Sequence, residues 1–142
     1  KICLMEGAEA GFTTASGMSA VFNSIVPFLK TGDHVIASRA VFGSTHQILT
    51  QILPRWNITF TYVDPDDTDS WEEAIQPNTK MLVLETPSNP GLTLIDLEAA
   101  GKFAKKHSAG APGTRHERRL NILPIVHGTV HSGFYARGYF FE

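Results

Sequence analysis

Residues 81–90 read Met-Leu-Val-Leu-Glu-Thr-Pro-Ser-Asn-Pro, and this stretch decides the fold. Its first four residues are apolar without alternation, a pattern that is typical of a strand buried on both faces of a sheet. Residues 85–90 form a polar loop with two prolines, which restrict the backbone of Asn89 and present its side-chain amide. Taken alone, the loop is explained about as well by a rigid turn that binds nothing.

The rest of the chain alternates between strand and helix patterns. Further strands are predicted at residues 34–38 and 58–64, and helices at residues 18–29, 44–53, 70–75 and 96–107. Strands that alternate with helices favour parallel pairing with right-handed crossovers. We therefore predict an α/β fold with a mostly parallel sheet and a ligand site beyond the carboxyl ends of its strands.

Helix boundaries can be predicted from capping residues and prolines. Pro27 predicts a kink or an early stop in the first helix, and Pro54 predicts the end of the second. The predicted N-caps are Ser16, Asp69 or Ser70, and Asp96.

The composition is that of a globular chain with one modest core. Of the 142 residues, 42% are hydrophobic and 18% are charged, and the formal net charge is -2. A chain without excess positive charge is not expected to bind nucleic acid or anionic membranes. The one cysteine, Cys3, has no partner for an internal disulfide, which is consistent with a reducing compartment, and we expect a cytoplasmic location.

Two further segments suggest a pocket for an anionic, planar ligand. Ser16-Gly17-Met18 begins a helix whose free N–H groups and positive dipole end can hold a phosphate, with the Ser16 hydroxyl as a further donor. Phe42 precedes Gly43 shortly after a predicted strand, so its ring could lie over a flat ligand. Taken singly, an ordinary capped helix and a core aromatic at a turn are the better explanations.

Together, three segments carry a family resemblance. Residues 14–18, 42–45 and 85–90 resemble, in the right order, the Cys/Met metabolism family of pyridoxal-phosphate (PLP) enzymes. The resemblance covers residues 4–107 and implies a fragment of the three-layer, mostly parallel-sheet large domain of the aspartate-aminotransferase-like (type I) fold. Phe42, where many members have tyrosine, is most similar to the O-succinylhomoserine sulfhydrylase branch, near cystathionine gamma-synthase.

The resemblance implies roles for single residues. The cofactor-binding residues that it implies are Ser16, Gly17, Met18, Phe42, Ser88 and Asn89. The first three would bind the cofactor phosphate, and the aromatic residue would stack on the pyridine ring. The last two would lie near the cofactor and the substrate carboxylate, and Glu85 would face inward at the strand end.

The resemblance also implies a reaction. The cofactor of the family is PLP, an electron sink that the protein aims and tunes. In the sulfhydrylase branch the substrate is an activated homoserine, whose acyl group is eliminated and replaced by sulfide to give homocysteine. The family is homo-oligomeric.

Residues 108–142 depart from the family pattern. After the helix that ends near His107, members continue with a strand bearing an Asp for the pyridine nitrogen, and later with a Ser-x-Thr-Lys segment whose lysine forms the Schiff base. The 108–142 segment contains no Asp and no Lys, so no catalytic residue is assigned. We interpret it as a divergent tail after a partial PLP-binding domain at residues 1–107; a shifted reading frame, a truncation and genuine divergence would each explain it.

Within this tail, residues 120–126 predict one more strand, and Pro124 favours an edge position for it. His127 and His131 have a spacing that suits a metal ion in a helix. Gly128 and its neighbours disfavour a helix there, so we predict no metal site.

Three functions stay open at this point. The first is a fragment of a PLP enzyme of methionine or cysteine metabolism. The second is a non-catalytic remnant or scaffold that binds phosphate or associates with full-length subunits. The third is an unrelated nucleotide- or phosphate-binding α/β domain, against which stands the lack of a Gly-x-Gly-x-x-Gly or Gly-x-x-x-x-Gly-Lys-Ser/Thr motif.

We predict that the 142-residue chain alone has no normal turnover, because it lacks the lysine and the aspartate that the resemblance requires. The measurement is homocysteine formation from O-succinylhomoserine and sulfide, with a full-length family member as the positive control. Turnover by the purified chain at about 1 s⁻¹ or faster, a rate typical of enzymes, would contradict this prediction.

Overall fold

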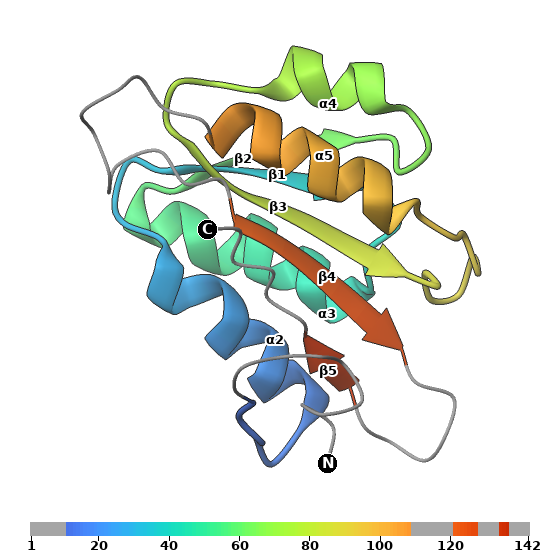
Figure 1. The fold of residues 1–142 in the computed structure, drawn as a ribbon. Coiled ribbons are helices and arrows are strands. Elements are labelled where there is room, and N and C mark those ends of the chain that lie inside the picture. The colour runs from blue at the N-terminus through green and yellow to red at the C-terminus, as the bar shows by residue number, and fades with distance from the viewer. Residues whose placement is uncertain (1–10, 109–120, 128–133, 137–142) are drawn as a thin grey trace.

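The computed structural model describes residues 11–108, 121–127 and 134–136, which form one sheet with helices on both faces (Figure 1). The helices are α2 (Gly17–Ile25), α3 (Gly43–Gln47), α4 (Thr68–Ala74) and α5 (Leu97–Ser108). The strands are β1 (His34–Ser38), β2 (Thr59–Val63), β3 (Thr79–Thr86), β4 (Asn121–His127) and β5 (Phe134–Ala136). Within these residues, no helix combines the length and apolar character needed to cross a bilayer.

The strand order in the sheet is β2-β1-β3-β4-β5. The first four strands run parallel, and β5 is antiparallel to β4. This confirms the predicted α/β fold with a mostly parallel sheet. β3 lies between β1 and β4, with Met81 opposite Val35 on one side and opposite Asn121 on the other.

Alternate residues of β3 face opposite helix layers. Met81 and Val83 lie in a cluster with residues of α2 and of the helical segment after α3, whereas Leu82 and Leu84 lie in a cluster with residues of α4 and α5. All four side chains are at most 1% exposed. The apolar run lacks alternation because both faces of this strand are covered.

Pro124 was predicted to lie on an edge strand, and this is wrong, because β4 lies between β3 and β5. On one side Pro124 is opposite Leu84. On the other side, β5 pairs with residues 125–127, so this ladder begins one residue after the proline. A proline lacks the N–H that a strand donates to its neighbours. It is tolerated in β4 because the pairing with β5 has not yet begun at this position.

Two of the three predicted caps are confirmed. Ser16 Oγ accepts the N–H of Ser19 at 3.2 Å, and an Asp96 carboxylate oxygen accepts two N–H groups in the first turn of α5. α2 ends at Ile25, before a short 3-10 turn that contains Pro27, in agreement with the predicted early stop.

The cap of α4 differs from the prediction. It is Asp67, whose Oδ1 lies 3.0 Å from the nitrogen of Asp69 and 3.3 Å from that of Ser70. A capping carboxylate binds N–H groups two and three residues further on. The two residues predicted as caps are therefore the capped donors.

Pro54 was predicted to end the helix at residues 44–53, and this is also wrong. After α3 the chain continues through a π-helical turn (Ile48–Ile52) and a 3-10 turn (Leu53–Trp56) that contains Pro54. The proline lies in the first turn of that last segment, where a missing N–H leaves no helical bond unmade. The helical path ends at Asn57, whose φ of 57° is left-handed.

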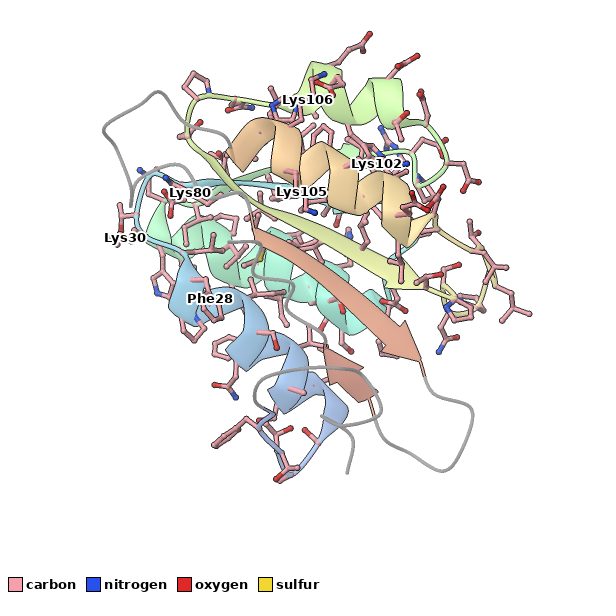
Figure 2. The ribbon with its side chains drawn as sticks, in the orientation of Figure 1. Phe28, Lys30, Lys80, Lys102, Lys105 and Lys106 are labelled. Atoms are coloured by element: carbon pink, nitrogen blue, oxygen red, sulfur yellow. The ribbon has the colours of Figure 1, made fainter. Side chains whose placement is uncertain are left out.

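Side chains at the ends of α4 and α5 link these helices. Lys106 Nζ and His107 Nε2 lie 2.7 and 2.8 Å from the two carboxylate oxygens of Glu72. The hydrogen bond from Lys106 is the largest of the effects that lower the pKa of Glu72. Because these groups are partly exposed, the link adds little stability. Figure 2 shows Lys106 beside α4, whereas Lys30 and Lys80 lie at the edge where β1 and β3 begin.

His34, the first residue of β1, is completely buried at the amino edge of the sheet. Its Nδ1 lies 2.8 Å from Thr79 Oγ1, and its Nε2 lies 2.9 Å from Thr61 Oγ1. Burial lowers the pKa of His34 from its ordinary value of 6.5, because a charged ring would lose its hydration there. The fold therefore stabilises the neutral imidazole.

We predict that His34 makes the chain less stable in mild acid. Below about pH 6.5 the unfolded chain binds a proton at this histidine that the folded chain does not, so the free energy of unfolding falls with pH. Urea unfolding at about pH 7.5 and about pH 5.5 measures the loss, which His34→Gln should reduce. His46→Gln removes an exposed imidazole and is the control; an equal loss in all three proteins would contradict the prediction.

Candidate cofactor-binding site

The predicted site residues lie at the carboxyl edge of the parallel strands. Phe42 follows the end of β1 at Ser38, and Ser88 and Asn89 follow the end of β3 at Thr86. α2 runs back across the sheet before β1 begins, so its first residues lie at this same edge. In Figure 1 they lie beside β5, which pairs with the end of β4.

The first turn of α2 presents main-chain donors. Gly17 and Met18 are its first two residues, and their N–H groups have no carbonyl partner within the helix. The next two N–H groups are bonded. That of Ser19 donates to Ser16 Oγ, and that of Ala20 donates to the Ser16 carbonyl at 3.1 Å. No acidic side chain lies in this turn, so its positive dipole end is not neutralised locally. A phosphate matches this arrangement.

A hydrogen bond joins the loop after β1 to the end of β3. The N–H of Phe42 donates to Glu85 Oε2 at 2.8 Å, across 43 positions of sequence. Glu85 is completely buried, and Phe42 is partly buried. Two of the three segments that carry the family resemblance are thus in direct contact.

Ser88 organises the loop that follows β3. It is 2% exposed, its Oγ accepts the N–H of Thr93 at 2.9 Å, and its carbonyl accepts the N–H of Leu92 at 2.8 Å. Its N–H donates to the Thr93 carbonyl at 3.0 Å. A Cβ at Gly91 would lie only 3.3 Å from Ser88 Oγ, so the loop is closed tightly around this hydroxyl. The hydroxyl has one hydrogen left to donate.

Asn89 is exposed at the tip of the same loop, between two cis peptide bonds, Thr86–Pro87 and Asn89–Pro90. Its amide carries two donors and one acceptor, a set that suits a carboxylate or a phenolic oxygen. Ser88 shapes the loop, and Asn89 is exposed at its tip.

Two features of this edge were not predicted. The bond between Phe42 and Glu85 could not be read from the sequence, although an acidic residue at the end of an apolar run is a signal of a functional strand end. The contacts of Ser88 with Thr93 are local, and its neighbour Gly91 is the only hint of close packing there.

β4 brings a histidine to this edge. Val126 is opposite Thr86, so His127, the last residue of β4, lies at the strand end, next to the loop after β3. His131, the second histidine of the possible metal pair, lies outside the described residues. Among the side chains that the structure describes, no three of the His, Cys, Asp or Glu type come together as a metal site would require.

Comparison with known proteins agrees with this geometry. A model of the family described as Cys/Met metabolism PLP-dependent enzymes matches residues 1–112. An O-succinylhomoserine sulfhydrylase of Mycobacterium tuberculosis is 45% identical over 111 residues, covering 78% of this chain and 27% of that protein. The enzyme of the same name from Pseudomonas aeruginosa is 41% identical over 140 residues, covering 92% of this chain and 34% of that protein. The second alignment extends well beyond His107, the residue at which the family resemblance ended in the sequence analysis.

A solved structure is similar over the same region. Cystathionine gamma-lyase from Lactobacillus plantarum, in complex with L-serine, superposes with a TM-score of 0.74 at 35% identity, covering 90% of this chain and 30% of that one. Proteins named L-methionine gamma-lyase and cystathionine beta-lyase also match. The chain spans about a third or less of the length of the curated relatives that it matches. It belongs to the Cys/Met metabolism family of PLP-dependent enzymes.

Proposed function

We propose that the carboxyl edge of this sheet binds PLP in an enzyme that replaces the acyl group of an activated homoserine with sulfide, giving homocysteine. The observation that carries the proposal is the bond between Phe42 and Glu85, because it joins two motif-bearing segments at the edge where α2 begins. Relatives named O-succinylhomoserine sulfhydrylase support the choice of reaction. We propose residues 1–107 as the PLP-binding part and a cytoplasmic location.

The residues at this edge fit the chemistry of the cofactor. PLP combines an anionic phosphate with a planar, aromatic ring. The N–H groups of Gly17 and Met18 match the phosphate, and the Ser16 hydroxyl has a hydrogen left to donate. The aromatic ring of Phe42 matches the face of a pyridine.

Each residue then has a task in the proposed site. Gly17 and Met18 would hold the phosphate of PLP and leave its planar ring to contacts from the neighbouring loops. Phe42 excludes water from one face of that ring, and Asn89 binds the carboxylate of the amino-acid substrate. When bound, PLP withdraws electrons from the substrate carbon that loses a proton.

Phe42 restricts what this side of the site can do. A phenylalanine has no hydroxyl, so it packs against a ring and can neither take up nor deliver a proton. In our proposal, proton transfers therefore belong to other groups, and Phe42 contributes stacking alone. The same property supports the sulfhydrylase reaction over others of the family, since many members have tyrosine there.

A second candidate function is a non-catalytic subunit that binds the cofactor and associates with full-length family members. It is favoured by residues 108–142, which contain no aspartate that could pair with the pyridine nitrogen. Co-expression with a full-length family member distinguishes the two: a mixed oligomer supports the second candidate, and separate elution of the two chains opposes it.

The proposed phosphate site is tested by titrating the full chain with pyridoxamine 5′-phosphate, which needs no lysine for binding, and with inorganic phosphate. We predict that Gly17→Asp weakens both by about tenfold or more, because a carboxylate then lies next to the phosphate. An acidic residue in the first turn favours the helix, so the variant should fold. Isothermal titration calorimetry measures both affinities.

Gln51→Glu is the charge control, because it adds the same charge to an exposed position in the helical segment after α3. We expect it to change either affinity by about twofold at most. If the unaltered chain binds neither ligand, or if both variants weaken binding equally, the proposed phosphate site is wrong.

A further inference from the structure

Glu85 is a buried acid at the end of the central strand. It is the last residue but one of β3, and none of its surface is exposed. It follows Met81 and Val83 on the face of the sheet that α2 and the helical segment after α3 cover. Burying a carboxylate is unfavourable unless it receives hydrogen bonds. One of the bonds that Glu85 receives comes from the main chain of Phe42, at 2.8 Å.

Two hydrogen bonds hold the main chain of Phe42. Phe42 is the N-cap of α3 and makes no side-chain capping bond. Its carbonyl accepts the N–H of His46 at 2.9 Å, and its N–H donates to Glu85. The second of these bonds ties Phe42 directly to β3.

We propose that Glu85 is a positioning residue, which holds Phe42 at the angle needed to stack on the ring of the cofactor. The direction of a side chain follows from its backbone, so a bond to the N–H of Phe42 also sets the direction of its ring. The side chain of Glu85 is long enough to reach the Phe42 N–H at 2.8 Å, and because it is completely buried it has little freedom to move. This inference rests on the proposed function, because it takes the ring of Phe42 to contact the cofactor.

The position also explains why a long acidic side chain stands at this point of β3. Glu85 is followed directly by Thr86 and by the loop that presents Asn89. One residue thus connects the proposed stacking ring to the strand from which the proposed carboxylate-binding loop leaves.

Two substitutions separate the reach of this side chain from its charge. Glu85→Gln keeps the length and leaves a carbonyl oxygen that can accept the Phe42 N–H, whereas Glu85→Asp keeps the charge and shortens the side chain by one methylene. Thr79→Val is the control for lost stability, because it removes a hydrogen bond to His34 at the opposite end of the same strand.

The full chain and each variant are titrated with pyridoxamine 5′-phosphate and with inorganic phosphate. The ratio of the two affinities reports on ring contacts, because both ligands use the phosphate site. We expect Glu85→Asp to lower the ratio by about tenfold, Glu85→Gln by about threefold at most, and Thr79→Val not at all. Hydrogen exchange of the Phe42 amide should be accelerated in Glu85→Asp.

Each result decides the matter. An unchanged ratio in Glu85→Asp, or unchanged exchange of the Phe42 amide, overturns the positioning role and leaves Glu85 with a structural one. A larger effect of Glu85→Gln than of Glu85→Asp also overturns it, since charge rather than reach would then matter. If the unaltered chain binds neither ligand, the proposed function fails and this inference fails with it, whatever the exchange rates are.

Discussion

The burial of β3 on both faces is the constraint on which the rest of the structure depends. Its four apolar residues are almost completely removed from water, and each such burial stabilises the fold by about 1.5–3 kcal/mol. A strand of this kind needs a helix layer on each side, which α2 and the helical segment after α3 provide on one face and α4 and α5 on the other. Parallel crossovers follow from that, and they bring every loop after a strand to one edge.

The proposed site at that edge relies largely on the main chain. Its donors for phosphate are the N–H groups of Gly17 and Met18, and the contact between Phe42 and Glu85 also uses an N–H. Main-chain donors are present whatever the side chain is, so small residues such as Gly17 serve by leaving access to them. Side chains then act by holding loops in place, as Ser88 does through Thr93.

The parts of the fold that could be predicted are those with local causes. The apolar run of β3, the cap at Ser16 and the cap at Asp96 depend on neighbouring residues, and each was predicted. The cap of α4 was misplaced because several adjacent residues can cap, and Pro124 was misplaced because its surroundings depend on where β5 begins.

The parts of the site that escaped prediction have distant causes. Family motifs indicated which residues to propose for the site, whereas the contact of Glu85 with Phe42 depends on a pairing of β1 with β3 that no single segment of sequence contains. The sequence also did not indicate that the loop encloses Ser88, because this depends on how the backbone folds back to Thr93.

The pairing of β1 with β3 also has a consequence for the order of folding. Parallel strands cannot be joined by a tight turn, so each pairing must close a long loop whose entropy is lost before the contact forms. The Phe42–Glu85 contact spans 43 positions and exists only once the centre of the sheet has assembled. A ligand held at this edge would therefore stabilise only those forms of the chain in which β1 and β3 are already paired.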